Sequence, residues 1–326
     1  MGGSVFLGAA SLSFTEVWGA ITHGTGLFVS PEFPQPSVLR QSILFDLRIP
    51  RILMSVIVGG ALAVAGAALQ AITRNNLAEP YLLGISSGAS TGAVVVIILT
   101  SGASIGGGVA LGLTGGAAIG ALVSFAVLLL LLRGSGFSST QVVLTGVLVG
   151  QFFAAITSLI LMARGDADSV RGVMFWLLGA LGASRWESLW VVAVVCSIAC
   201  AVIWSISRYL DCLSFGDDTA ESMGVPVAKV RGIVLVSVAL LTAATVSAVG
   251  AIGFIGLIVP HAVRMLIGPA HSALIPVSAL LGSSFLVITD ALARTVFSPQ
   301  EVPVGVFTGI IGVPVFFLIL KRGRQL

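Results

Sequence analysis

Few side chains in the apolar part of this chain could carry out chemistry. His261, Arg264 and Asp290 are the only ionisable groups that come close to the middle of an apolar run. The histidines and cysteines lack metal-ligand spacing, and we find no G-x-x-x-x-G-K-[ST] phosphate loop and no nucleophile–base pair. We therefore expect no catalytic residue, no metal site and no cofactor bound by this chain. The three cysteines are expected to act as small apolar residues: Cys196, Cys200 and Cys212.

A short acidic segment is the best candidate for a contact with an energy-supplying partner. The stretch LSFGDDTAESMGVP begins at Leu213 and carries Asp217 and Asp218 at a predicted helix start. Gly224 and Pro226 would stop that helix. The helix dipole favours acidic residues at such a start. These residues alone leave two interpretations open, a docking helix and an ordinary surface helix.

Composition identifies the elements that must position these residues as membrane helices. Hydrophobic residues make up 57% of the chain, charged residues 9%, and the mean hydropathy is +1.11. Several apolar runs reach the roughly 20 residues that span a bilayer core. The 40 glycines allow close helix packing. We predict an all-α polytopic membrane protein, and the net charge of +3 gives no argument for nucleic acid.

The apolar runs predict nine transmembrane helices, of which the seventh is short and glycine-rich. The basic tail KRGRQL places the C-terminus in the cytoplasm by the positive-inside rule. Residues 1–51 are then an external segment, and VFLGAASLSF within it is too short to span. The predicted spans lie near 52–72, 82–99, 109–132, 141–163, 188–207, 230–250, 252–267, 273–291 and 303–320.

The spans divide into groups of four, one and four, which favours an inverted repeat. An offset of five crossings turns the second group upside down, an arrangement typical of transporters. Two similar stretches, GAALQAI from Gly66 and GAIGFIG from Gly250, both lead into proline-containing segments. Ion-coupled transporters usually carry a buried carboxylate, and none is clear here.

Arginines are unusually frequent on the predicted outer side. Arg48 and Arg51 are three residues apart, so they share one helix face, and Pro50 suits the first turn of a helix. Arg294 could pair with Asp290, four residues earlier. Docking of a partner, anchoring at the membrane interface and simple ion pairing all remain open for these residues.

Six motifs, in order along the chain, carry a resemblance to a known family. They are LRIPRIL (47–53), GGALAVAGAALQAITRNNLAEPYLLGISSGAS (59–90), MFWLLGAL (174–181), FGDDTAESMGVP (215–226), GAIGFIGLIVPHAVR (250–264) and EVPVGVFTGIIGVPVFFLILK (301–321). In these motifs the chain resembles the FecCD-type permeases of ABC importers for vitamin B12, haem and ferric siderophores. The resemblance implies an inverted-repeat permease bundle, usually of ten helices, whose first helix is absent here or precedes a late start codon.

The resemblance assigns roles to three groups of residues. The polar stretch that follows the first span corresponds to the cytoplasmic mouth, where irregular backbone can line a water-filled cavity. Glycines such as Gly84 and Gly88 can absorb a backbone change there, whereas Asn76, where the family usually has proline, should loosen the loop slightly. The implied gate residues are Asn75, Leu77, Ser138, Ser139 and Thr140. The implied ATPase-coupling residues, within the loop 208–229, are Phe215, Gly216, Asp217, Asp218, Ala220, Glu221, Met223 and Gly224. The implied docking residues for a binding protein are Arg48, Arg51 and Arg294.

The sequence therefore predicts a single permease domain over residues 1–326 in a prokaryotic cytoplasmic membrane. It would work as a homodimer, or with a sister permease, beside a pair of ATP-binding subunits that hold ATP and magnesium. An external binding protein would deliver a bulky metal chelate, with a ferric siderophore favoured over haem and cobalamin. The rival classes are an ion-coupled secondary transporter and, second, a passive channel or a purely structural membrane protein.

Overall fold

The computed structural model describes residues 37–100, 108–133, 138–298 and 300–323, and we find only helices and connections among them. The helices at or near membrane length are α3 (Ile49–Thr73), α4 (Ile85–Thr100), α5 (Gly108–Leu131), α6 (Ser139–Arg164), α8 (Trp186–Ser205), α11 (Val227–Val249), α12 (Ile255–Ile267), α13 (His271–Thr295) and α14 (Val304–Gly323). The short elements are α2 (Val38–Ser42), η2 (Ile43–Arg48), η3 (Pro80–Leu83), α7 (Ala167–Leu177), α9 (Ser207–Leu213) and α10 (Asp217–Ser222).

Each of the nine predicted spans corresponds to a helix. Six helices are long and apolar enough to cross a membrane, and α4, α12 and α14 are shorter apolar helices. The predicted multi-pass, all-α architecture is thereby confirmed. Helix α7 was not predicted; it begins where the Asp166 carboxylate accepts a hydrogen bond of 2.8 Å from the Ser169 backbone N–H.

The first span begins earlier than the predicted residue 52. Elements α2, η2 and α3 form one continuous helical segment from Val38 to Thr73. The π-helical turn η2 ends just before Pro50, where the proline cannot supply an α-helical hydrogen bond in any case. The first turns of this segment contain polar residues, so hydropathy alone did not predict that the helix extends this far. Residues 1–36 lie outside the described residues.

Helix α3 is the central element of the bundle. Every residue from Val58 to Thr73 is buried. Its glycines lie against other helices: a Cβ on Gly59 would collide with Gly282 of α13, and one on Gly66 with Gly256 of α12. The two similar stretches noted in the sequence therefore touch each other at Gly66 and Gly256. Helices can approach this closely only where both carry small residues.

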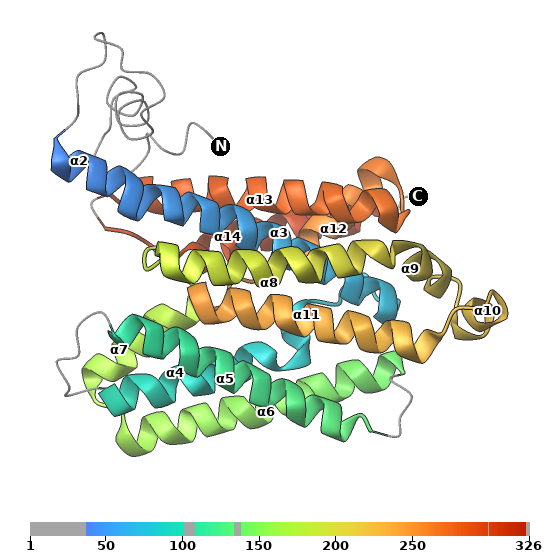
Figure 1. The fold of residues 1–326 in the computed structure, drawn as a ribbon, viewed down its shortest axis with the longest axis horizontal. Helices are drawn as coiled ribbons and strands as arrows, with labels where there is room; N and C mark the ends of the chain where they lie inside the picture. The colour runs from blue at the N-terminus through green and yellow to red at the C-terminus, as the bar shows by residue number, and fades with distance from the viewer. Residues whose placement is uncertain (1–36, 101–107, 134–137, 299, 324–326) are drawn as a thin grey trace, which may run out of the picture.

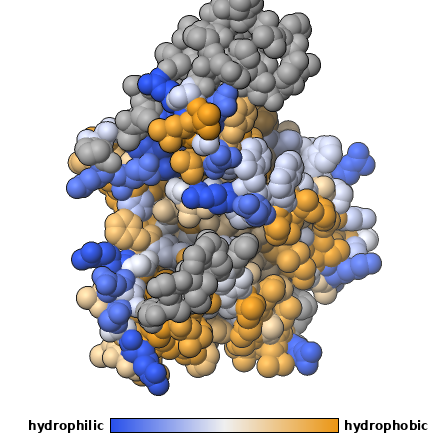
Figure 2. Space-filling model, turned by 60° about the vertical axis from the view of Figure 1, so that its left-hand side comes forward, coloured by the Kyte–Doolittle hydropathy of each residue, from blue (hydrophilic) through white to orange (hydrophobic). Residues whose placement is uncertain are grey.

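The bundle has two distinct ends (Figure 1). Helix α10 projects at one end, near the C-terminus, and we call this the α10 end. Helices α2 and α7 lie at the opposite end, the α7 end. Figure 2 brings the α7 end toward the viewer and shows hydrophilic side chains spread between apolar patches.

Candidate gate and coupling site

The connection between α3 and α4 runs back into the bundle beside α12. It begins at Arg74, whose φ of 50° ends α3. Asn76 Oδ1 accepts a hydrogen bond of 3.0 Å from Arg264 near the end of α12. Glu79 Oε1 accepts one of 2.7 Å from the Phe254 N–H at the start of α12. The ten residues between these two contacts on α12 correspond to about 15 Å of helix, so the connection reaches well into the protein.

Two residues without an assigned role hold this connection in place. The amide of Gln70 is buried; its Nε2 lies 3.2 Å from the Gly256 carbonyl and 3.4 Å from the Ala78 carbonyl. Arg264 donates to Gln70 Oε1 at 3.3 Å as well as to Asn76. The sequence predicted that Asn76, in place of proline, would loosen the loop. The hydrogen bond from Arg264 to the Asn76 side chain opposes that loosening. Gln70 was detectable, as a single amide in an otherwise apolar run.

The two predicted gate segments both lie at the α10 end. In the first, Asn75 Oδ1 accepts from the Leu77 N–H at 2.9 Å, and the Leu77 side chain is 49% exposed. In the second, Ser138 precedes α6 and donates to the side chain of Gln141, while Thr140 is exposed. Ser139 donates a hydrogen bond of 2.9 Å to the Ile72 carbonyl, so the second segment touches the end of the helix that leads into the first.

The predicted coupling segment forms a short helix between two glycines with positive φ. Gly216 (φ 107°) precedes α10 and Gly224 (φ 82°) follows it. Phe215 and Met223 are 71% and 57% exposed, which leaves two large apolar side chains on a segment outside the membrane-length helices. Asp218 and Glu221 are also exposed. Ala220 is fully buried, so its side chain packs inward, and its role in coupling stays a prediction.

A cluster around Asp217 joins α10 to three other elements; we call it the Asp217 cluster. The guanidinium of Arg231, on α11, contacts both carboxylate oxygens of Asp217, at 2.8 and 3.0 Å. The same guanidinium donates to Ser139 Oγ at 3.1 Å. Arg74 lies 3.7 Å from Asp217. The Arg231 side chain is 4% exposed and Asp217 is 35% exposed, so the cluster reaches from the interior to the surface.

A second ionic cluster, at the α7 end, contains the predicted docking arginines; we call it the Asp290 cluster. Asp290 lies 2.9 Å from Arg51 and 3.1 Å from Arg294, and Arg51 also contacts Glu301 at 2.8 Å. The side chain of Asp290 is 1% exposed.

The three predicted docking arginines are largely buried, and their docking role stays a prediction. Arg48 is 6% exposed as a residue, and the side chains of Arg51 and Arg294 are 12% and 4% exposed. The cause is the early start of the first helix: Arg51 lies inside a continuous helix, not at an N-terminus, and the neighbouring α13 supplies its counter-charge. The alternative pairing of Arg294 with Asp290 is the one that the structure contains.

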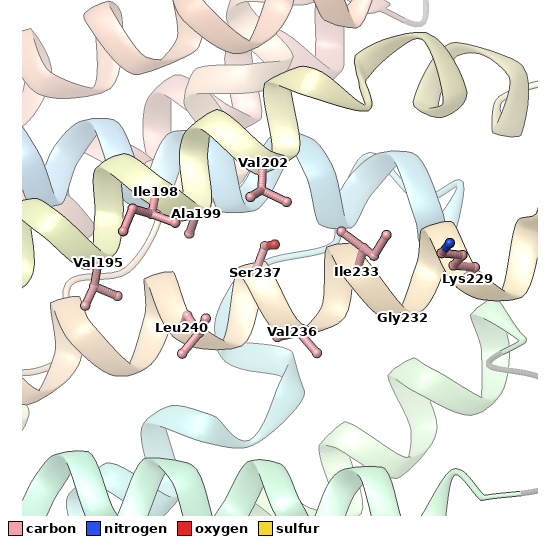
Figure 3. Close-up of a pocket in the computed structure, with 10 residues that line it drawn as sticks. All are labelled: Val195, Ile198, Ala199, Val202, Lys229, Gly232, Ile233, Val236, Ser237 and Leu240. Atoms are coloured by element: carbon pink, nitrogen blue, oxygen red, sulfur yellow. The ribbon is translucent and has the colours of Figure 1, made fainter.

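Two hollows flank these elements. A partly polar cavity of about 430 Å³ lies at the α10 end, where Asn76, Phe215 and Arg264 contribute to its walls. A groove of about 550 Å³ runs between α8 and α11 and is lined by apolar side chains except at Lys229 and Ser237 (Figure 3). None of the predicted gate or coupling residues lines the groove.

Comparisons with known proteins agree with this architecture. The model of the FecCD transport family matches residues 2–322. A cobalamin import system permease protein of Halobacterium salinarum is 40% identical over 87% of this chain and 74% of its own length. An iron(3+)-hydroxamate import system permease protein of Bacillus subtilis is 35% identical over 90% of this chain and 87% of its own. A solved structure of an inward-facing putative metal-chelate type ABC transporter is similar with a TM-score of 0.80 and 31% identity, over 94% of this chain and 96% of that one.

Proposed function

The chain belongs to the FecCD transport family, and from this membership we propose that it is the membrane permease of an ABC importer for a metal chelate. The observation that carries the proposal is the likeness over nearly the whole chain to a metal-chelate type transporter. In this assignment the chain is not the ATPase; it provides the path, and a separate pair of subunits hydrolyses ATP. The α10 end then faces the cytoplasm and the α7 end faces outward, across a prokaryotic cytoplasmic membrane.

We place the contact with the ATP-binding subunit at α10. Large apolar side chains exposed outside the membrane mark surfaces that partners cover, and Phe215 and Met223 meet that description. We expect Met223→Ser to weaken recovery of the ATP-binding subunit with the affinity-tagged permease. Met162→Ser is a matched control, because Met162 is 89% exposed but lies at the end of α6 that adjoins α7. Equal recovery with both variants would reject α10 as the docking helix.

We place the cytoplasmic gate where the two polar segments approach the mouth of the path. The proposal is supported by the irregular backbone of residues 74–84 and by the contact of Ser139 with Ile72. Cysteines at Leu77 and Thr140, in a background without Cys196, Cys200 and Cys212, should crosslink within or between protomers. The yield should change when ATP is trapped on the partner subunits. A pair that never crosslinks in any nucleotide state would reject the gate.

Docking of an external binding protein is proposed at the α7 end. Arg48, Arg51 and Arg294 remain the candidate receivers of its acidic residues, although they are buried here. Glu301 is 48% exposed and touches Arg51, so an incoming carboxylate could take its place. We therefore expect Glu301→Gln to strengthen docking at low salt, because it removes the competing acid; weaker or unchanged docking would contradict this.

For the cargo we propose a ferric siderophore, with haem and cobalamin as the alternatives. The relatives named above are an iron-hydroxamate and a cobalamin import permease at similar identity, and the ranking rests on this resemblance, not on an assigned ligand-contacting residue. Binding of a ferric hydroxamate, haem and cobalamin to the partner binding protein would decide between them. The permease is proposed to act as a homodimer or with a sister permease, since ATP-binding subunits work in pairs and this chain offers one coupling segment.

A further inference from the structure

We infer that Arg231 is a positioning residue through which movement of the coupling helix reaches the cytoplasmic gate. The inference rests on the proposed function, because it takes α10 as the coupling helix and the two polar segments as the gate. It adds two residues that neither the sequence motifs nor the family likeness assigned, Arg231 and Arg74, and it makes them the partners of the implied coupling residue Asp217.

The contacts of one guanidinium make the connection. Arg231 holds Asp217 of α10 through two hydrogen bonds of 2.8 and 3.0 Å and holds Ser139 of α6 through a third of 3.1 Å. Ser139 in turn donates to the Ile72 carbonyl at the end of α3. One side chain on α11 therefore joins the coupling helix to one gate segment directly and to the helix before the other gate segment through a single hydroxyl.

Asp217 reaches the other gate segment by a second route. Its Oδ1 lies 3.7 Å from Arg74, the residue at which α3 ends and the polar connection begins. The Arg74 guanidinium also covers Gly216, since a Cβ on that glycine would lie 3.3 Å from Arg74 Nη1. A displacement of the first turn of α10 must therefore pull on two cations, one beside each gate segment.

Arginine is suited to this position and lysine is not. The planar fork binds both oxygens of a carboxylate and still offers a donor to a third group. The Arg231 side chain is buried on a long helix, whereas Asp217 is 35% exposed on a short one, so α11 supplies the fixed end of the linkage and α10 the moving end. The Arg231 Nε is buried without an acceptor among the described residues, which favours rearrangements that give it one.

The test compares an acid inside the Asp217 cluster with an exposed acid outside it. Asp217→Asn keeps the shape of the side chain but removes the charge that Arg231 and Arg74 hold. Asp168→Asn makes the same change on α7, at the opposite end of the bundle, on an exposed side chain for which the structure shows no ionic partner among the described residues. Both variants are assembled with the ATP-binding subunits and the binding protein, and uptake and ATP hydrolysis are measured together.

We expect Asp217→Asn to lower uptake per ATP hydrolysed by about tenfold or more, in the range of coupling between distant sites, with normal complex recovery. The ATP-dependent change in Leu77–Thr140 cysteine crosslinking should be lost as well; Thr140 is used because a cysteine at Ser139 would alter the linkage itself. Asp168→Asn should behave as the parent. The exchange Asp217→Arg with Arg231→Asp should restore part of the coupling.

The outcomes separate the inference from the proposed function. If Met223→Ser does not change the recovery of the ATP-binding subunit, α10 is rejected as the coupling helix. Impaired recovery with Met223→Ser, combined with equal uptake per ATP in Asp217→Asn and Asp168→Asn, rejects the role of Arg231 and leaves the proposed function standing. Folding of Arg231 variants does not limit the test, since the decisive variant changes the exposed partner.

Discussion

The two ionic clusters use the same residue types in opposite settings. In the Asp290 cluster the acid is buried, at 1% exposure, and the arginines on either side belong to helices already in close contact. In the Asp217 cluster the arginine is buried, at 4%, and the acid lies on a short, partly exposed helix. The first therefore fixes one packing arrangement, whereas the second ties an accessible element to the interior.

The difference shows which kind of ion pair can transmit movement. Separating a buried carboxylate from its arginines leaves buried charges without partners, which costs much free energy. The Asp290 cluster should therefore keep one arrangement. A carboxylate near the surface can exchange its partner for water at little cost. The burial of the acid, more than that of the arginine, distinguishes a structural cluster from one that can transmit movement. Substitutions in the two clusters should therefore have different effects on stability and transport.

The largest effect on stability is expected from Asp290→Asn. The change removes the carboxylate that lies within 3.1 Å of Arg51 and Arg294, in a buried place where a broken pair costs about 3–5 kcal/mol. We expect a clear loss of folded protein in detergent, measured by thermal unfolding followed by size-exclusion chromatography. Asp168→Asn, on the exposed face of α7, is the control, and equal stability of the two variants would refute the structural role of the Asp290 cluster.

Arg231→Met should affect stability less and transport more. Its removal leaves Asp217, which is 35% exposed and can be hydrated, so we expect a loss of about 1 kcal/mol in the free energy of unfolding. Uptake per ATP should nevertheless fall as in Asp217→Asn. The control is Lys229→Met, on the same helix but exposed. If Arg231→Met lowered the free energy of unfolding as much as Asp290→Asn does, the Asp217 cluster would be as structural as the Asp290 cluster.

Glu301→Gln should have a small effect on stability. Glu301 is 48% exposed, and Arg51 keeps its contact with Asp290. Exposed pairs contribute on the order of 0.2–1 kcal/mol, and thermal unfolding should shift accordingly. A loss comparable to that of Asp290→Asn would mean that the exposed acid, not the buried one, holds the cluster together.

The smallest effect on stability is expected from Arg74→Met. Arg74 is 44% exposed and lies 3.7 Å from Asp217, so water screens the pair strongly, and we expect a change below about 0.5 kcal/mol. The ATP-dependent crosslink at Leu77 should still weaken, because one of the two routes from α10 is lost. A crosslink response identical to that of the parent would restrict the linkage to Arg231.

The helices were predictable from the sequence because apolar runs of sufficient length have few alternatives in a membrane. The connection Arg74–Gly84 was also visible, as a polar interruption. The burial of Ala220 and Arg51 was not, since it depends on which neighbour faces each side chain: Asp290 is 239 residues from Arg51 in the chain. Pro50 suits a helix start, but it lies within a longer helical segment, just after the π-helical turn η2.

The central claim is that this chain imports a metal chelate with energy from a separate ATPase. The most direct measurement is uptake of a radio-iron-labelled ferric hydroxamate into proteoliposomes that hold the permease, its ATP-binding subunits and its binding protein. We predict that uptake requires ATP on the side of the membrane where the ATP-binding subunits lie. Uptake should be lost when the ATP-binding subunit cannot hydrolyse ATP. Uptake that proceeds without that subunit, driven by a proton or sodium gradient, would contradict the account.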